Sequence, residues 1–214
     1  MQTVNFNEVM QQDLMDWFDI QKVEELPVLT NWLSADNELN TSEKEYLTII
    51  KKDTLKFANG WNEQELFGGM IGPILSVGQL NTDRFHLFAQ RELTADIGEI
   101  RLTGKVDGLL ATGFQRPKKP FFCLNEYKKS FEFRGEPIGQ CLAAMLVSHT
   151  INNDNNPIYG IFIVGKAWYF LVLENNKYAI SPEYDATKND IFEIPKILKK
   201  LKTIVNAILD AEQK

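Results

Sequence analysis

The chain has 214 residues, of which 44% are hydrophobic and 11% aromatic, so it is long enough to bury a sizeable core. Its formal net charge of -6 excludes a general nucleic-acid coat protein, which needs a basic excess, but not an enzyme that grips a few phosphates through a metal. No apolar run is long enough to span a bilayer, and the first residues lack the pattern of a signal peptide. Cys123 and Cys141 stand in apolar stretches without CxxC spacing, so we expect reduced thiols in a cytoplasmic protein with no membrane partner.

The first 60 residues predict helices. Apolar residues between Asn5 and Phe18 recur at roughly helical spacing, and "LPVLTNWLS" predicts a short second helix. After a polar break, "SEKEYLTIIKKDTLKFANG" predicts a long helix that begins at a capping box of Ser42 with Glu45. We therefore expect a helical N-terminal extension over residues 1–60.

Residues 61–214 predict a single α/β (α+β) domain that includes the C-terminal helix. "NEQELFGGMIGPILSVGQL" predicts a helix that is weakened at its glycines and at Pro73, and "EPIGQCLAAMLVSHT" a helix with Pro137 in its first turn. "IFEIPKILKKLKTIVNAILDAEQK" predicts a basic amphipathic helix. Between these helices, strands are predicted at "RFHLFAQRELTADI", "IGEIRLTGKVDGLLA", "PFFCLNEYK", "PIYGIFIVG" and "AWYFLVLEN". This order predicts a mixed central sheet flanked by helices.

Two acids and a lysine interrupt the predicted strands on either side of the loop "TGFQRPKKP". Side chains alternate along a strand, so Glu126 and Lys128 point to one face about 7 Å apart, and Phe122 and Leu124 share that face. If the two strands form a hairpin without a bulge, Asp107 lies opposite Glu126 with Cβ atoms about 5 Å apart. The same register pairs Leu109 with Leu124, Ala111 with Phe122 and Lys105 with Lys128.

Two carboxylates this close repel each other, and each raises the pKa of the other. A hard divalent cation removes the conflict, because Mg²⁺ is held by one or two carboxylates together with waters and phosphate oxygens. Such an ion lowers the pKa of a bound water and stabilises charge on a phosphodiester. We therefore expect Asp107 and Glu126 to hold Mg²⁺ or Mn²⁺. Lys128 would position or deprotonate the water, or neutralise the phosphate.

Asp107 on one strand and Glu126-Tyr127-Lys128 on the next resemble the signature of the PD-(D/E)XK nuclease superfamily, and the predicted element order resembles its restriction-endonuclease-like core. The resemblance covers roughly residues 62–165. It departs from the family at Val106, where the name-giving proline would stand, and at Gly72, where an aspartate usually precedes the helix proline.

Two helices carry the resemblance further. "ELFGGMIGPIL" resembles the helix before the core strands of restriction enzymes, including the N-terminal domain of type I restriction-enzyme R subunits, which implies Glu65 as a further metal ligand. "GEPIGQCLAAM" resembles the helix of RecB-like nuclease domains in which a glutamine faces the site, which implies Gln140. Glu65 is equally explained as a first-turn acid favoured by the helix dipole, and Gln140 as a buried amide bonded to backbone.

The resemblance implies a Mg²⁺-dependent nuclease that hydrolyses DNA by water attack without a covalent intermediate. Asp107, Glu126, Lys128 and Gln140 would be catalytic. Two alternatives stay open: an RNA-directed nuclease, and a non-catalytic nucleic-acid-binding or assembly module that retains the fold. The acidic net charge favours a protein partner or a homodimer. Four basic residues near the hairpin loop are either solvated or contact DNA phosphates: Arg116, Lys118, Lys119 and Lys129.

Overall fold

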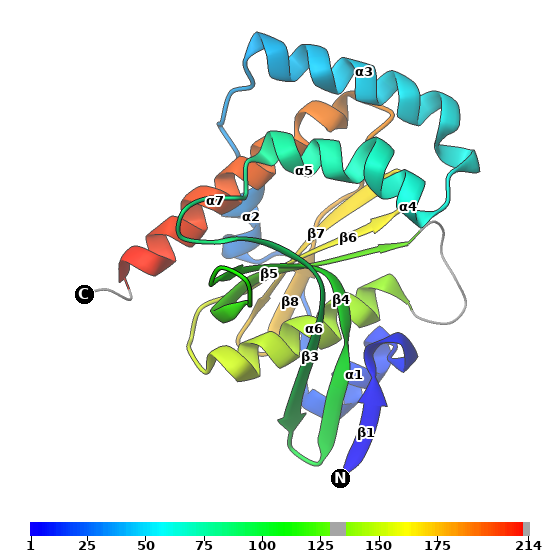
Figure 1. The fold of residues 1–214 in the computed structure, drawn as a ribbon. Helices are drawn as coiled ribbons and strands as arrows, with labels where there is room; N and C mark the ends of the chain where they lie inside the picture. The colour runs from blue at the N-terminus through cyan, green and yellow to red at the C-terminus, as the bar shows by residue number, and fades with distance from the viewer. Residues whose placement is uncertain (129–135, 212–214) are drawn as a thin grey trace.

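A mixed nine-stranded sheet runs through the part of the protein that the computed structural model describes, residues 1–128 and 136–211 without the side chains of residues 123–125 (Figure 1). The order along the sheet is β1-β4-β5-β6-β7-β8-β2, with β3 added to β4 and β9 added to β7. The strands are β1 (Gln2–Asn5), β2 (Gln21–Lys22), β3 (His86–Ile97), β4 (Ile100–Thr112), β5 (Lys118–Lys128), β6 (Ile158–Val164), β7 (Ala167–Glu174), β8 (Lys177–Ile180) and β9 (Tyr184–Asp185).

Helices cover both faces of this sheet and define two apolar cores (Figure 1). One core lies under α2 (Pro27–Leu33), α3 (Thr41–Phe57), α5 (Gly72–Gly78) and α7 (Ile194–Ala211). The other lies under α1 (Gln11–Phe18) and α6 (Pro137–Asn152). Shorter helical pieces are η1 (Phe6–Glu8), η2 (Ala58–Gly60), α4 (Glu63–Leu66), η3 (Phe67–Ile71) and η4 (Asn189–Phe192). The expected mixed α/β class, with helices flanking a mixed sheet, is confirmed.

The N-terminal 60 residues differ from the expected helical extension. Two strands lie among them: β1 pairs in parallel with β4, and β2 pairs in parallel with β8. The helix predicted from Asn5 is divided: Asn5 ends β1, Phe6–Glu8 form the 3-10 helix η1, and the α-helix begins only at Gln11. The segment also fills both cores, with Val4 and Leu14 in one and Trp32 in the other, so no break in packing falls at residue 60.

The helices that precede the core strands also begin differently from the prediction. The capping box of α3 consists of Asn40 and Glu43, two residues before the predicted pair. The glycine-rich helix is one continuous rod of α4, η3 and α5, and η3 is a π-helical turn at the predicted weak point. None of the helices in the described part of the chain is long and apolar enough to cross a membrane.

The β4–β5 hairpin has the predicted register in its middle and a different one near its loop. Leu109 pairs with Leu124 as expected, but Ala111 pairs with Phe121 because the register shifts on both sides of Ala111. The shift sends Phe122 into the same core as Tyr127, on the face opposite Glu126. The described β4–β5 ladder stops at Gly108 and Asn125, so it does not include the predicted Lys105–Lys128 pair.

Candidate active site and the groove beside it

Asp107 lies where the ladder between β3 and β4 is interrupted. The flanking pairs are Ala89 with Gly108 and Arg91 with Val106, but Gln90, opposite Asp107, has a left-handed φ of 56°. The Gln90 side chain turns to the acid instead, and its Nε2 donates to Asp107 Oδ1 at 2.6 Å. On the other side, the Tyr127 backbone N–H donates to Asp107 Oδ2 at 3.0 Å. The Asp107 carboxylate thus accepts hydrogen bonds from both neighbouring strands, β3 and β5, and these bonds hold it in one orientation.

Glu126 and Lys128 lie next to this acid on β5. Glu126 is only 6% exposed, and its Oε1 lies 3.0 Å from Lys128 Nζ. Burial, and then the negative charge of Asp107, raise the pKa of Glu126 to about 7 despite this ion pair. Burial by itself would lower the pKa of Lys128, but Glu126 and then Asp107 outweigh it and raise that pKa. Lys128 is therefore an ammonium group, and Glu126 is a carboxylate that is unfavourable to ionise.

The electrostatics of Asp107 follow the same pattern. Burial raises the pKa of Asp107, although the Tyr127 N–H, the charge of Lys128 and the Gln90 amide act in the opposite direction. At both carboxylates, burial therefore outweighs the nearby positive charge of Lys128. Across the residues that the structure describes, no group of three or more His, Cys, Asp or Glu side chains could hold a metal ion. Two carboxylates completed by waters and phosphate oxygens suit Mg²⁺ or Mn²⁺ and not a closed zinc site.

The glutamate that the electrostatics couple to this pair is Glu63. It acts on Glu126, Tyr127 and Lys128, whereas Glu65 appears in none of these interactions. Glu65 caps α4: its Oε2 accepts from the Asn62 backbone N–H at 2.8 Å. The metal role of Glu65 stays a prediction, and its carboxylate already has a structural use. The pattern Asn62-x-x-Glu65 is itself a capping-box signature that distinguishes the two acids in the sequence.

The remaining sequence-predicted residues are Gln140, three basic residues of the hairpin and Lys129. Gln140 is buried in α6, whose other residues are almost all buried too, as expected, and α6 packs against β5. Three exposed basic residues sit at the loop end of the β4–β5 hairpin, five residues along β4 from Asp107, which is roughly 17 Å. They are Arg116, Lys118 and Lys119. Lys129 falls outside the described residues.

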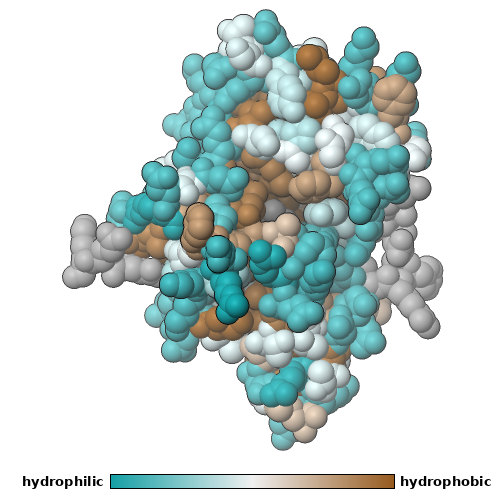
Figure 2. Space-filling model, viewed as in Figure 1, coloured by the Kyte–Doolittle hydropathy of each residue, from teal (hydrophilic) through white to brown (hydrophobic). Residues whose placement is uncertain are grey.

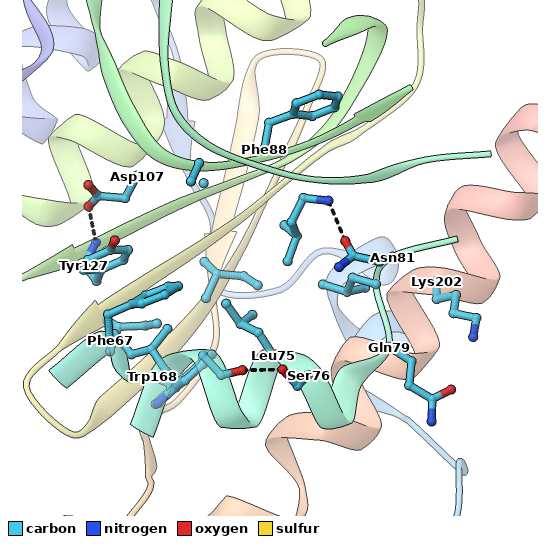
Figure 3. Close-up of a pocket in the computed structure, with 18 residues that line it drawn as sticks. Phe67, Leu75, Ser76, Gln79, Asn81, Phe88, Asp107, Tyr127, Trp168 and Lys202 are labelled. Atoms are coloured by element: carbon cyan, nitrogen blue, oxygen red, sulfur yellow. Dashed lines mark hydrogen bonds between the residues drawn. The ribbon is translucent and has the colours of Figure 1, made fainter. Parts of the chain in front are cut away.

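A groove of about 660 Å³ opens directly beside Asp107. It lies between the η3–α5 rod and the start of β3, and β5 and β6 form its floor (Figure 3). Asp107 and Tyr127 lie at one end, and Gln79 and Lys202 at the other (Figure 3). The lining is mostly apolar, and it appears as a brown hollow near the centre of the face in Figure 2. Such a volume is typical of ligand sites.

An aromatic pair stands at the Asp107 end of the groove. The rings of Phe67 and Tyr127 are stacked, with centroids 5.6 Å apart and an interplanar angle of 27°. Phe67 is 39% exposed, and Tyr127 comes between Glu126 and Lys128 in the chain. The sequence did not predict this pair, nor the role of Gln90. No local pattern marks a left-handed glutamine, and the stack joins residues from separate elements.

No protein-family model matches the chain, and no curated protein matches it.

Proposed function

We propose that this chain is a Mg²⁺- or Mn²⁺-dependent nuclease that hydrolyses phosphodiester bonds of DNA, and that its sheet and helices form a restriction-endonuclease-like core. The observation that carries the proposal is the pair Asp107 and Glu126, two carboxylates with raised pKa values on adjoining strands, with the Lys128 ammonium against one of them. Stabilising three such charges in the fold alone is unfavourable, and sites with these perturbations are typically functional.

Asp107 and Glu126 would hold the ion. A bound Mg²⁺ supplies a water of lowered pKa and neutralises charge on the phosphate. Gln90 and the Tyr127 N–H fix the orientation of Asp107 before any ligand arrives. Lys128, because it is protonated, donates hydrogen bonds and positive charge and does not remove a proton in this state. Of the roles expected for Lys128, stabilising the phosphate is therefore favoured over deprotonating the water.

The test is incubation of linear and circular DNA with the purified protein and Mg²⁺, Mn²⁺ or EDTA. We expect slow nicking or degradation with either metal and none with EDTA. Glu126→Gln and Lys128→Met should each abolish cleavage without unfolding the protein. Lys199→Met is a matched control, because Lys199 forms a largely buried ion pair with Glu43 at 2.7 Å. The Lys199→Met variant should still cleave DNA. Cleavage that survives in both site variants contradicts the proposal.

The second candidate is a non-catalytic binding or assembly module that retains the fold, in a cytoplasmic setting and with a protein partner or a second copy. The closed ion pair of Glu126 with Lys128 favours it, because the pair is satisfied without a metal. This candidate predicts that metal shifts the melting temperature of wild type and Glu126→Gln equally or not at all. The nuclease predicts a rise in the wild type alone, because a metal that binds only the native state stabilises it.

A further inference from the structure

The groove beside Asp107 has the walls of a site for a flat apolar group. Leu75 of α5 (Figure 3), Leu87 of β3, and Ile161 and Ile163 of β6 line it. These side chains come from three elements that are rigidly packed on the sheet. The walls of the groove are thus formed mainly by helices and strands, so the groove is preformed.

The Phe67–Tyr127 stack brings an aromatic face to the mouth of this slot. Phe67, in this stack, is 39% exposed. Exposed aromatic rings next to a phosphate-handling site are the platforms on which nucleic-acid bases stack.

The charged residues that line the groove lie at its two ends. Asp107 is at the end where the phosphate would be cleaved, and Lys202 of α7 is at the far end. Asn81 lies near Lys202, and its Oδ1 accepts from the Leu87 backbone N–H at 2.9 Å, which fixes the orientation of its amide. A nucleotide strand has this same pattern, because apolar base faces alternate with charged phosphates.

We infer that this groove receives an unpaired nucleotide of the substrate strand, with its base against the Phe67 platform and a neighbouring phosphate at Lys202. The inference rests on the proposed nuclease function and names its substrate class: single-stranded DNA or the frayed ends of a duplex. Bases inside an intact duplex are stacked and paired, so they reach such a slot only after leaving the helix.

The test is equilibrium binding in EDTA, where no cleavage occurs, with a fluorescent oligonucleotide as single strand and as blunt duplex. Ser76 is an exposed residue that lines the groove, so Ser76→Phe fills the slot while the fold is kept. Ser42→Phe makes the same change on the exposed face of α3 and is the matched control. Phe67→Ala removes the platform.

Wild type and Ser42→Phe should bind the single strand about tenfold more tightly than the duplex. Ser76→Phe and Phe67→Ala should each lose about tenfold in single-strand affinity, within the range measured for base stacking. Equal affinity for both DNA forms, or unchanged binding by Ser76→Phe, overturns the inference even if the protein cleaves DNA. A single-strand preference that Ser76→Phe abolishes supports the groove site even if no DNA is cut, in which case the nuclease proposal alone fails.

Discussion

Glu126 is a buried acid whose charge state changes the stability of the fold. Its pKa is about 7 in the folded protein and near the ordinary 4.5 when unfolded. Below pH 4.5 both states are protonated, and the folded state benefits fully from the raised pKa. As pH rises through 7 that contribution is lost, because the unfolded state gives up the proton more easily. The difference is on the order of 3 kcal/mol at most.

This linkage predicts the behaviour of Glu126→Gln without metal. Gln keeps the shape of the side chain and does not titrate, so the variant should melt several degrees above wild type at pH 8, at about 2–4 °C per kcal/mol for a chain of this size. At pH 4.5 the two proteins should melt together, because Glu126 is then protonated. Thermal unfolding followed by circular dichroism at the two pH values measures the difference. A variant that melts lower at pH 8 would show that the ion pair with Lys128 outweighs burial.

Asp107→Asn is the contrasting variant at the same scale. Both oxygens of Asp107 accept hydrogen bonds, from Gln90 and from the Tyr127 N–H, and Asn has only one acceptor oxygen. Removing its charge therefore also breaks a bond, so the sequence-level expectation of simple repulsion between Asp107 and Glu126 is incomplete. The hairpin register predicted that Asp107 would interact with Glu126, and the charge of Asp107 does raise the pKa of Glu126. It could not predict that Gln90 would adopt a left-handed conformation to hold one of them.

Among the elements, the β4–β5 hairpin shows how far sequence reasoning reaches. The register of a hairpin without a bulge predicted the pairing of Leu109 with Leu124. Side-chain alternation leaves a strand with one buried face little freedom to change its register. The register shift at Ala111 depends on how the loop closes, which alternation does not encode. The long helices α6 and α7 were predictable from composition, whereas the start of α1 was not, because apolar spacing does not distinguish the 3-10 helix η1 from the α-helix that begins at Gln11.

Helix α6 packs so closely on the N-terminal segment that one methyl group should disturb the contact. A Cβ on Gly139 would meet the Val9 carbonyl oxygen and the backbone of Met10, neither of which can rotate away. Gly139→Ala should therefore destabilise the protein by about 1–3 kcal/mol, seen as a lower melting temperature. Gly68→Ala in η3 is the control, since nothing lies within 4 Å of its added Cβ. An unchanged melting temperature for Gly139→Ala would mean that the N-terminal segment is loosely attached.

Over the whole molecule, the charge distribution predicts how DNA binding responds to salt. The protein is acidic, with a net charge of -6, yet the hairpin loop presents Arg116, Lys118 and Lys119 to solvent. If these residues contact phosphates, replacing all three with Ala should weaken DNA binding and flatten its salt dependence, because each phosphate contact releases a counterion. The cleavage rate at saturating DNA should not change, since the loop lies well away from Asp107.

A matched triple variant on α3 separates this effect from a general change in charge. This variant replaces three exposed lysines with Ala: Lys44, Lys52 and Lys56. It removes the same amount of positive charge as the hairpin variant. Binding isotherms at several salt concentrations measure both slopes. The same slope for the loop variant as for wild type would assign the loop lysines to plain solvation.

The two short strands near the N-terminus also determine when the protein can fold. β1 pairs with residues 100–103 of β4, and β2 pairs with residues 177–178 of β8. On the ribosome, the first 22 residues therefore emerge long before either partner exists, and the sheet is complete only when most of the chain has been made. Pairings this distant in sequence slow folding, because a large loop must close before they form. Nascent chains should thus stay without their full sheet, and open to proteases, until β8 and β9 have left the exit tunnel.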